Sequence, residues 1–321
     1  MSKYSGGLRS LKAVYWLNNI ANRNKLKHNK NIYEKYGLKK SIFSPIGKQD
    51  FKLSSSDIPW LDQTDGISKL QSSTFYKESS SEIQGQLEHF IEHGYIILKS
   101  FYTIEEVSTL NKEMEHLVNK GELDFNYTGK KIMESYKYST LVDTHFFKNP
   151  KLLELLNFIM GKPIVPFHTI NFIEGSEQKA HSDFIHMTTE PEGYLIAAWT
   201  ALEETHADNG PLFFYPDSHK LPYITCQDYD SGNSRWLIGN RSYKNYEEHV
   251  AQVVKEHGLK KEYFYAEPGD LFIWHANLLH GGDPIAKPGL TRKSMVAHYF
   301  CEDVICYHEI SQRPALIPEI E

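Results

Sequence analysis

Two widely separated segments of the chain carry side chains that could bind one metal ion together. One is the triplet His181-Ser182-Asp183, and the other is EPGDLFIWHANLLHGGDPI, which contains His275 and His280. Two imidazoles and one carboxylate can occupy one face of a ferrous ion and leave the opposite face open for a chelating co-substrate and dioxygen. These residue types therefore predict the chemistry of a non-haem iron oxygenase.

The chain contains a second His-x-Asp triplet, so the pattern alone does not identify a metal site. His206-Ala207-Asp208 leads directly into Asn209-Gly210, and Asp-Asn-Gly is typical of a tight turn. We therefore predict a hairpin corner there. The triplet at 181–183 follows a polar loop, and in an extended segment His181 and Asp183 would point to the same side because side chains alternate along a strand.

The third ligand and the co-substrate anchor must come from the second segment and its surroundings. His275 and His280 are both candidates for the third ligand, and spacing alone does not decide between them. Arg292 follows His280 by twelve residues. A planar guanidinium can bind a distal carboxylate through two hydrogen bonds, so Arg292 could anchor 2-oxoglutarate while its 2-oxo acid end chelates iron.

Composition sets the broad class of the protein. The chain has 321 residues, 40% hydrophobic residues and a formal net charge of −6, which argues against a nucleic-acid partner. No apolar run approaches the ~20 residues of a membrane span. The basic N-terminus could touch an anionic surface, although a solvated helix is the expected state. Three cysteines are typical of reduced thiols in a cytoplasmic protein.

The order of predicted elements indicates an α+β chain that ends in a β-sandwich. Residues 1–80 form a polar, partly helical N-terminal extension, with helices near 8–26 and 29–37 and an irregular Ser-rich run after them. Residues 81–321 form the folded domain, which begins with helices and continues in short strands. Helices are predicted at 81–93, after Thr103, at 152–160 and at 242–259, and strands at 95–99, 163–173, 194–204, 210–216, 263–275 and 293–300.

Four blocks, in order, resemble the phytanoyl-CoA dioxygenase (PhyH-like) family of Fe(II)/2-oxoglutarate-dependent oxygenases. The blocks are HGYIILKSFYTIEEVSTLNKEM, HSDFIHM, AAWTALEETHADNGPLFFYPDSHK and EPGDLFIWHANLLHGG, followed by Arg292. The resemblance implies a double-stranded β-helix, or jelly-roll core, flanked by helices. It also implies Fe(II), 2-oxoglutarate and O₂ as cofactor and co-substrates. Its implied iron ligands are His181, Asp183 and His280, and its implied 2-oxoglutarate contacts are Arg292, Trp199 and Lys137.

The resemblance also implies the reaction, which is hydroxylation or a related C–H oxidation of a small-molecule metabolite with release of succinate and CO₂. Asp183 is present where a halogenase would bind halide, which argues against halogenation. Gly282 stands where the family often has serine. Cavity-facing substrate contacts are predicted for His186, His168, Asn171 and Tyr215, each of which could equally be a core residue.

Three other functions fit parts of the pattern. Two histidines and one carboxylate also suit a zinc enzyme. A jelly-roll protein could retain a metal site without catalysis. The presence of all four site residues argues against this, because a site that has lost its catalytic function should lack at least one of them. The polar N-terminal extension could instead recruit a partner, as in a scaffolding protein.

Overall fold

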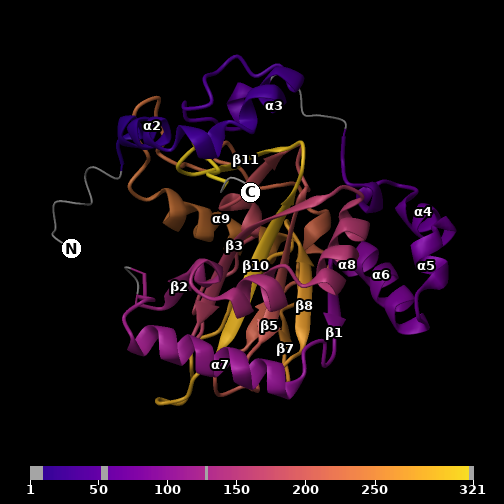
Figure 1. Cartoon of the computed structure of the whole chain (residues 1–321). Coiled ribbons are helices and arrows are strands. Elements are labelled where there is room, and N and C mark those ends of the chain that lie inside the picture. Colours follow the sequence, from indigo (N-terminus) through magenta and orange to yellow (C-terminus); the bar gives the residue numbers. More distant parts are fainter. Residues whose placement is uncertain (1–9, 52–56, 127–128, 318–321) are drawn as a thin grey trace.

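The computed structural model describes residues 10–51, 57–126 and 129–317, and its centre is a set of antiparallel β-sheets (Figure 1). The large sheet has the strand order β1-β8-β5-β10-β3-β2, and two smaller sheets have the orders β7-β6-β9 and β12-β11-β4. The strands are β1 Tyr95–Leu98, β2 Lys131–Met133, β3 Ile164–Phe172, β4 Thr188–Glu190, β5 Leu195–Ala201, β6 Leu212–Phe214, β7 Glu262–Phe264, β8 Leu271–His275, β9 His280–Gly282, β10 Ser294–Cys301, β11 Ile305–His308 and β12 Arg313–Pro314.

An aromatic core lies between the large sheet and the β7-β6-β9 sheet. Phe272 of β8 packs against Phe214 of β6 and Phe264 of β7, with ring centroids 4.9 and 5.2 Å apart. All three rings and their neighbours Trp199 and Trp274 are buried. Two sheets that face each other across inward-pointing side chains form the double-sheet architecture of a jelly roll.

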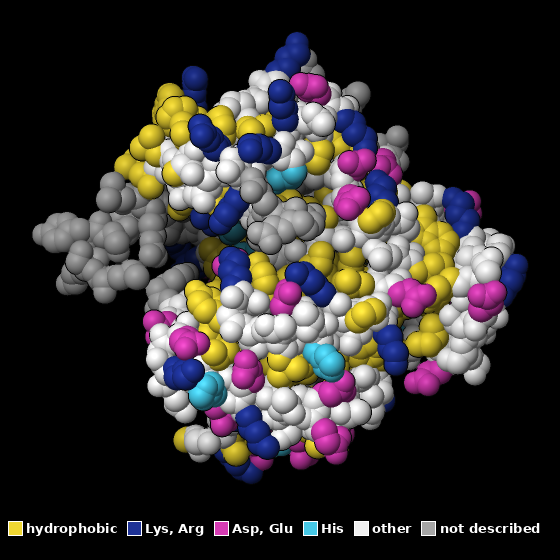
Figure 2. All heavy atoms as spheres, viewed as in Figure 1, with side chains coloured by type: hydrophobic (Ala, Val, Ile, Leu, Met, Phe, Trp, Pro, Cys, Tyr) yellow, Lys and Arg dark blue, Asp and Glu magenta, His cyan; other side chains and the backbone are white. Residues whose placement is uncertain are grey.

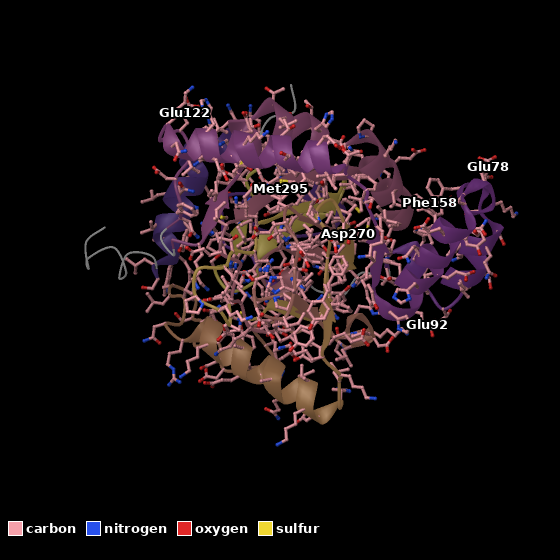
Figure 3. All side chains as sticks on the ribbon, turned by 90° about the horizontal axis from the view of Figure 1, so that it is seen from below. Glu78, Glu92, Glu122, Phe158, Asp270 and Met295 are labelled. Atoms are coloured by element: carbon pink, nitrogen blue, oxygen red, sulfur yellow. The ribbon has the colours of Figure 1, made fainter. Side chains whose placement is uncertain are left out.

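Helices cover the outer face of the large sheet, where a second and larger hydrophobic core forms. In Figure 3, α7 and α9 lie on opposite sides of the sheets, and Met295 of β10 lies below α7. The predicted helix at 81–93 is present, and Gly94 ends it with a φ of 84°. Thr103 and Glu106 form the expected capping box of α7. The helices on the side of α7 are α6 Ser81–His93, α7 Ile104–Asn119 and α8 Pro150–Met160, and the helix on the opposite side is α9 Ser242–Glu256.

Short helical turns connect the strands and carry part of the cavity wall described below. They are η4 Ser135–Lys137, the π-helical turn η5 Val142–Phe147, η6 Asp183–Ile185 and η7 Ser218–Lys220. Of these, η6 begins at the predicted ligand Asp183.

The N-terminal extension is more helical than its composition predicts. The two expected helical stretches are α2 Lys12–Ala21 with η1 Arg23–Leu26, and α3 Asn29–Lys35; η2 Lys48–Asp50 follows. The Ser-rich run was predicted to be irregular, and this is wrong for its described part, which contains η3 Trp60–Asp62, α4 Gly66–Ser72 and α5 Thr74–Glu78. Ser73 caps α5 by accepting a hydrogen bond from the Tyr76 amide, and Phe75 stacks on Phe158 of α8 at 4.1 Å.

The extension packs on the strands near the C-terminal end of the chain. Tyr33, Leu38 and Ile46 are buried against Ile305 and Tyr307 of β11, as α3 and β11 in Figure 1 show. The Ile46 amide also donates a hydrogen bond to the carbonyl of Gln312 at 2.8 Å. Among the described helices, none combines the length and apolar character needed to cross a membrane.

Candidate active site

The backbone brings the two predicted ligand segments together. His181 and His280 form an isolated antiparallel bridge, in which each amide donates to the other's carbonyl at 2.9 Å. Ser182 is extended, with φ −103° and ψ 148°, so Asp183 returns to the same side as His181. One ligand atom from each of His181, Asp183 and His280 lies within 4.8 Å of the other two, and all three residues are buried. This donor set fits a metal ion with one open face.

His275, the other candidate for the third ligand, lies outside the predicted metal site. The Nε2 atom of His275 is 3.1 Å from Asp62 Oδ2 of the N-terminal extension, and its ring lies 5.5 Å from that of His219. His275 is thus a structural residue beside β1, and His280 is the histidine that joins the triplet. The other His-x-Asp triplet forms a turn, with the His206 amide donating to Asn209 Oδ1 at 2.8 Å. The predicted hairpin is wrong, because β5 and β6 on either side of this turn belong to different sheets.

Backbone carbonyls orient both imidazoles. The Nδ1–H of His181 donates to the Lys179 carbonyl at 2.8 Å, and that of His280 donates to the Leu278 carbonyl at 2.9 Å. Each ring therefore presents an unprotonated Nε2 to the site, which is the state that binds metal. Burial and the neighbouring His280 lower the pKa of His181 to about 3, and burial lowers the pKa of His280.

Two residues that the sequence argument missed hold the carboxylate. Trp274 Nε1 donates to Asp183 Oδ2 at 2.7 Å, and His298 Nε2 lies 3.3 Å from the same oxygen. Burial alone would raise the pKa of Asp183, but His298 and His280 outweigh it and keep that pKa well below its usual value. His298 was detectable from the sequence, because strand alternation from Arg292 places Ser294, Val296 and His298 on one face.

Arg292 is a buried cation without a carboxylate partner among the described residues. It is 1% exposed, and it donates to Ser294 Oγ at 3.0 Å and to Ser176 Oγ at 3.4 Å. Its Nε has no hydrogen-bond partner. Its guanidinium carbon lies 5.7 Å from the ring of Trp199, the other predicted co-substrate contact. Burial lowers the pKa of Arg292 to about 10, so the group stays charged at neutral pH. Because an unpaired buried charge is energetically costly, this site favours the binding of an anion.

One cavity of about 360 Å³ joins these groups. It is lined by all three predicted ligands, by Arg292 and Trp199, and by the predicted substrate contacts His168 and His186. Asn171 and Tyr215 are outside this lining. Asn171 lies on the other face of β3, where its Oδ1 accepts a hydrogen bond from Ser135 at 2.5 Å, and Tyr215 packs in the core below α9.

The predicted lysine contact also lies outside the cavity. Lys137 forms an ion pair with Glu134 at 2.6 Å on η4. Lys131 of β2 lines the cavity instead, with its ammonium 5.7 Å from the Phe172 ring, and it forms no ion pair with any described residue. Burial lowers its pKa. Lys131 could not be preferred from sequence, because β2 has only three residues and its pairing with β3 is visible only in the fold.

Arg313 is the charged residue of another part of the cavity lining, which also contains three histidines. His308 of β11 and Arg313 of β12 lie in this part, together with His168 and His186. Burial lowers the pKa of His308 to about 4 and that of His168 to about 3, so both are neutral near pH 7. Asp183 is the one acidic residue of the described lining.

The chain is similar to proteins of one known family of dioxygenases. The sequence profile of the family described as "Phytanoyl-CoA dioxygenase (PhyH)" matches residues 90–294. Peroxisomal phytanoyl-CoA dioxygenase of Bos taurus is 24% identical over 246 residues, which cover 70% of this chain and 69% of the bovine protein. Ectoine dioxygenase of Halomonas elongata is 26% identical over 254 residues, covering 72% and 73% of the two chains.

Solved structures show the same fold. The ectoine dioxygenase EctD from S. alaskensis, solved with 2-oxoglutarate and 5-hydroxyectoine, superimposes with a TM-score of 0.56 at 18% identity and covers 80% of this chain and 86% of its own. The non-heme alpha-ketoglutarate-dependent carbocyclase SnoK has a TM-score of 0.57 at 13% identity, covering 72% and 87%. These similarities confirm the predicted α+β jelly-roll fold.

Proposed function

Because this chain belongs to the phytanoyl-CoA dioxygenase family of iron- and 2-oxoglutarate-dependent oxygenases, we propose that it hydroxylates a C–H bond of a small-molecule metabolite. The reaction consumes O₂ and 2-oxoglutarate and releases succinate and CO₂. We assign His181, Asp183 and His280 as the iron ligands and Arg292 as the 2-oxoglutarate anchor.

One observation carries this proposal. The buried guanidinium of Arg292 lines the same cavity as the three ligand side chains and has no carboxylate partner among the described residues. Such a cation has no role in holding the metal itself, whereas a dicarboxylate that chelates the metal would supply the missing anion. Bound Fe(II) with 2-oxoglutarate would supply the oxidising power for the C–H bond.

The chain's own residues prepare the site. The carbonyls of Lys179 and Leu278 fix the tautomers of His181 and His280, while Trp274 and His298 orient Asp183. The aromatic side chains Phe172 and Trp199 exclude water from the Arg292 end, which strengthens the binding of an anion there.

The size of the cavity and the composition of the chain support a proposed substrate class and a proposed location. The cavity volume of about 360 Å³ suits a small organic molecule. We also propose a cytoplasmic location without a nucleic-acid partner, supported by the free thiols of Cys226, Cys301 and Cys306 and by the net charge of −6.

An anaerobic binding experiment tests the proposal. Fe(II) and 2-oxoglutarate added to the purified protein should give a weak visible charge-transfer band, absent in His181→Ala and weakened in Arg292→Ala. The exposed Arg241→Ala variant is the matched control and should keep the band. Absence of the band in the unmodified protein, with zinc bound tightly in its place, would contradict the proposal and support hydrolytic or binding functions.

A further inference from the structure

Six of the thirteen exposed large hydrophobic side chains of the described residues lie in one place. Four come from α2 and two from the loop before α9, and we call them the apolar patch: Val14, Trp16, Leu17, Ile20, Trp236 and Leu237. Leu17 is 61% exposed and Trp236 is 66% exposed. A concentration of exposed apolar side chains of this kind marks an interaction surface, whereas single exposed hydrophobics do not.

The two parts of the apolar patch form one continuous surface. Leu11 and Leu237 form an antiparallel backbone bridge. The Lys12 amide donates to the Trp236 carbonyl at 3.0 Å, and the Ile238 amide donates to the Ser10 carbonyl at 2.8 Å. Figure 2 shows a group of hydrophobic side chains at the upper left of the molecule, in the position of α2 in Figure 1, with Lys and Arg side chains close by.

The N-terminal segment that carries four of the six patch residues has charges of a single sign. Residues 1–33 contain seven Lys and Arg and no Asp or Glu, while the remaining 288 residues contain 28 basic and 41 acidic residues and so carry a formal charge of −13. Several of the basic side chains beside α2 and the loop are exposed: Arg23, Lys25, Lys27, Lys30 and Arg235. The positive charge of the chain is therefore concentrated where the apolar side chains are exposed.

We propose that this face binds the surface of an anionic phospholipid bilayer, with α2 lying parallel to the membrane at the headgroup level. A helix with exposed Trp, Leu and Ile on one side and Lys and Arg nearby is typical of interfacial membrane binding. Exposed Trp side chains such as Trp16 and Trp236 favour the boundary between headgroups and acyl chains. A second copy of this chain is a poorer occupant, because a twofold interface would place this basic surface against itself.

A cavity beside the apolar patch offers a site for a lipid phosphate. It has a volume of about 760 Å³, and three cations line it, Lys12, Lys40 and Arg235, together with Trp16 and Trp236. The Lys12 ammonium is fixed by the Ser234 carbonyl at 2.6 Å and by Gln312 Oε1 at 2.7 Å, both neutral acceptors. One acidic side chain, Asp50, is also in the lining, and it is already paired with Lys40 at 2.8 Å.

The proposed orientation brings a cavity that adjoins the active site close to the membrane surface. Asn18 and Asn19 of α2 line a smaller cavity that shares His168, His308 and Arg313 with the cavity of the predicted metal site. The Arg313 guanidinium lies 4.9 Å from the ring of Tyr15, also on α2. A protein docked through α2 would thus take up substrate next to the headgroups. Membrane binding itself does not depend on the oxygenase activity.

Vesicle co-sedimentation of the full chain tests the proposal. Vesicles of phosphatidylcholine alone are compared with vesicles that contain phosphatidylserine as well. We expect at least tenfold stronger binding to the anionic vesicles, because each Lys or Arg at the surface contributes about fivefold. Raising the NaCl concentration to about 0.5 M should weaken this binding, because exposed charges are screened.

Matched variants separate the apolar and the basic contributions. Leu17→Glu should abolish binding, whereas Ile104→Glu, at the N-terminus of α7 and 68% exposed, should not change it. The double variant Arg23→Glu/Lys30→Glu should lose more than tenfold in binding to anionic vesicles. Lys112→Glu/Lys260→Glu changes the net charge equally at exposed positions elsewhere and should bind as before.

Two controls make a negative result decisive. The charge-transfer band with Fe(II) and 2-oxoglutarate should be the same in all four variants, so a loss of vesicle binding can be told from misfolding or from failure of the oxygenase site. No binding to either vesicle, equal binding to both, or equal loss in Leu17→Glu and Ile104→Glu would overturn the proposal. A dimer in solution that Leu17→Glu dissociates would assign the apolar patch to a second copy instead.

Discussion

Gly282 leaves the space that the hydroxyl of Ser176 fills beside the Arg292 guanidinium. A Cβ atom at position 282 would lie 2.4 Å from Ser176 Oγ and 3.1 Å from Arg292 Nη2. Gly282 was noted in the sequence because the resembling family often has serine there, with a hydroxyl near the co-substrate. Here Ser176, from the loop after β3, places a hydroxyl at Arg292 from the opposite side.

We therefore predict that Gly282→Ser weakens 2-oxoglutarate binding by about tenfold, equivalent to about 1.4 kcal/mol. The new side chain forces Ser176 away from Arg292. Titration of the charge-transfer band with 2-oxoglutarate measures the effect. The double variant Gly282→Ser/Ser176→Gly should recover most of the affinity, and Gly85→Ser, at a position with open space around it, should have none of the defect. An unchanged affinity in Gly282→Ser would show that Ser176 has no such role.

A second prediction concerns the two lysines near β2. Lys131→Ala should weaken 2-oxoglutarate binding by about tenfold, because its unpaired ammonium and Arg292 both lie within 6.0 Å of the Phe172 ring. Lys137→Ala should change it less than about twofold, since Lys137 is paired with Glu134 outside the cavity. The same titration measures both, and a larger effect for Lys137 would favour the assignment made from sequence.

At the residue scale, sequence reasoning found the residues whose chemistry is distinctive and missed those that support them. His181, Asp183, His280, Arg292 and Trp199 all lie in or around one cavity. Trp274 and Lys131 were missed because their roles depend on which strands are neighbours, whereas His298 could have been found from its alternation with Arg292 along one strand. Spacing left the choice between His275 and His280 open, and the family resemblance favoured His280. The structure places His275 against Asp62, outside the group of three ligands.

At the scale of elements, α9 supports the metal segment from outside the jelly roll. The Ser182 amide, between two predicted ligands, donates to the Tyr246 hydroxyl of α9 at 3.0 Å. Tyr246 is fully buried, as is Ser182. The helix thus helps to fix the backbone that carries His181 and Asp183, although it contributes no ligand itself.

We predict that Tyr246→Phe lowers the free energy of unfolding by about 2 kcal/mol, because it leaves the buried Ser182 amide without a partner. It should also weaken metal binding by several-fold. Urea denaturation measures the first effect and Fe(II) titration the second. Tyr138→Phe removes a hydroxyl from an exposed side chain and should be neutral in both assays. Unchanged metal affinity in Tyr246→Phe would show that α9 does not help to position the metal ligands.

Local signals explain which elements the sequence could predict. Helix caps at Thr103 and Gly94 and apolar runs in β3, β5 and β10 depend on neighbouring residues alone, and these predictions are confirmed. The β12-β11-β4 sheet was missed because its strands have two to four residues, and β4 pairs with β11 across more than 110 residues. The helices of the Ser-rich run were missed because serine is favoured both at helix N-caps and in loops.

At the scale of the whole molecule, burial of several neutral imidazoles makes stability depend on pH. Burial lowers the pKa of His219 and His168 to about 3, and of His28 and His308 to about 4. The unfolded chain, with histidine pKa values near 6.5, therefore binds more protons than the folded chain below that pH. The stabilisation is fully present above about pH 6.5 and is lost progressively as the pH falls toward 4.

The metal-free protein should thus lose at least about 2 kcal/mol of unfolding free energy between pH 7.5 and pH 5. Urea denaturation at the two pH values measures this loss. His219→Gln, which lies away from the predicted metal site, should reduce the difference. His145→Gln, at a half-exposed surface position, should leave it unchanged. A pH-independent stability would show that the buried histidines are protonated or solvated in the folded state.

The pairing of Lys12 with Gln312 joins positions 300 residues apart. The amide of Ile46 reaches the same residue, and Tyr33 and Leu38 pack on β11. Within this sequence the extension is synthesised well before its partners Gln312 and β11. Contacts of such long sequence separation close late, because the intervening loop must be ordered first. The extension is therefore fixed only after β11 has been synthesised, and until then α2 stays available to chaperones.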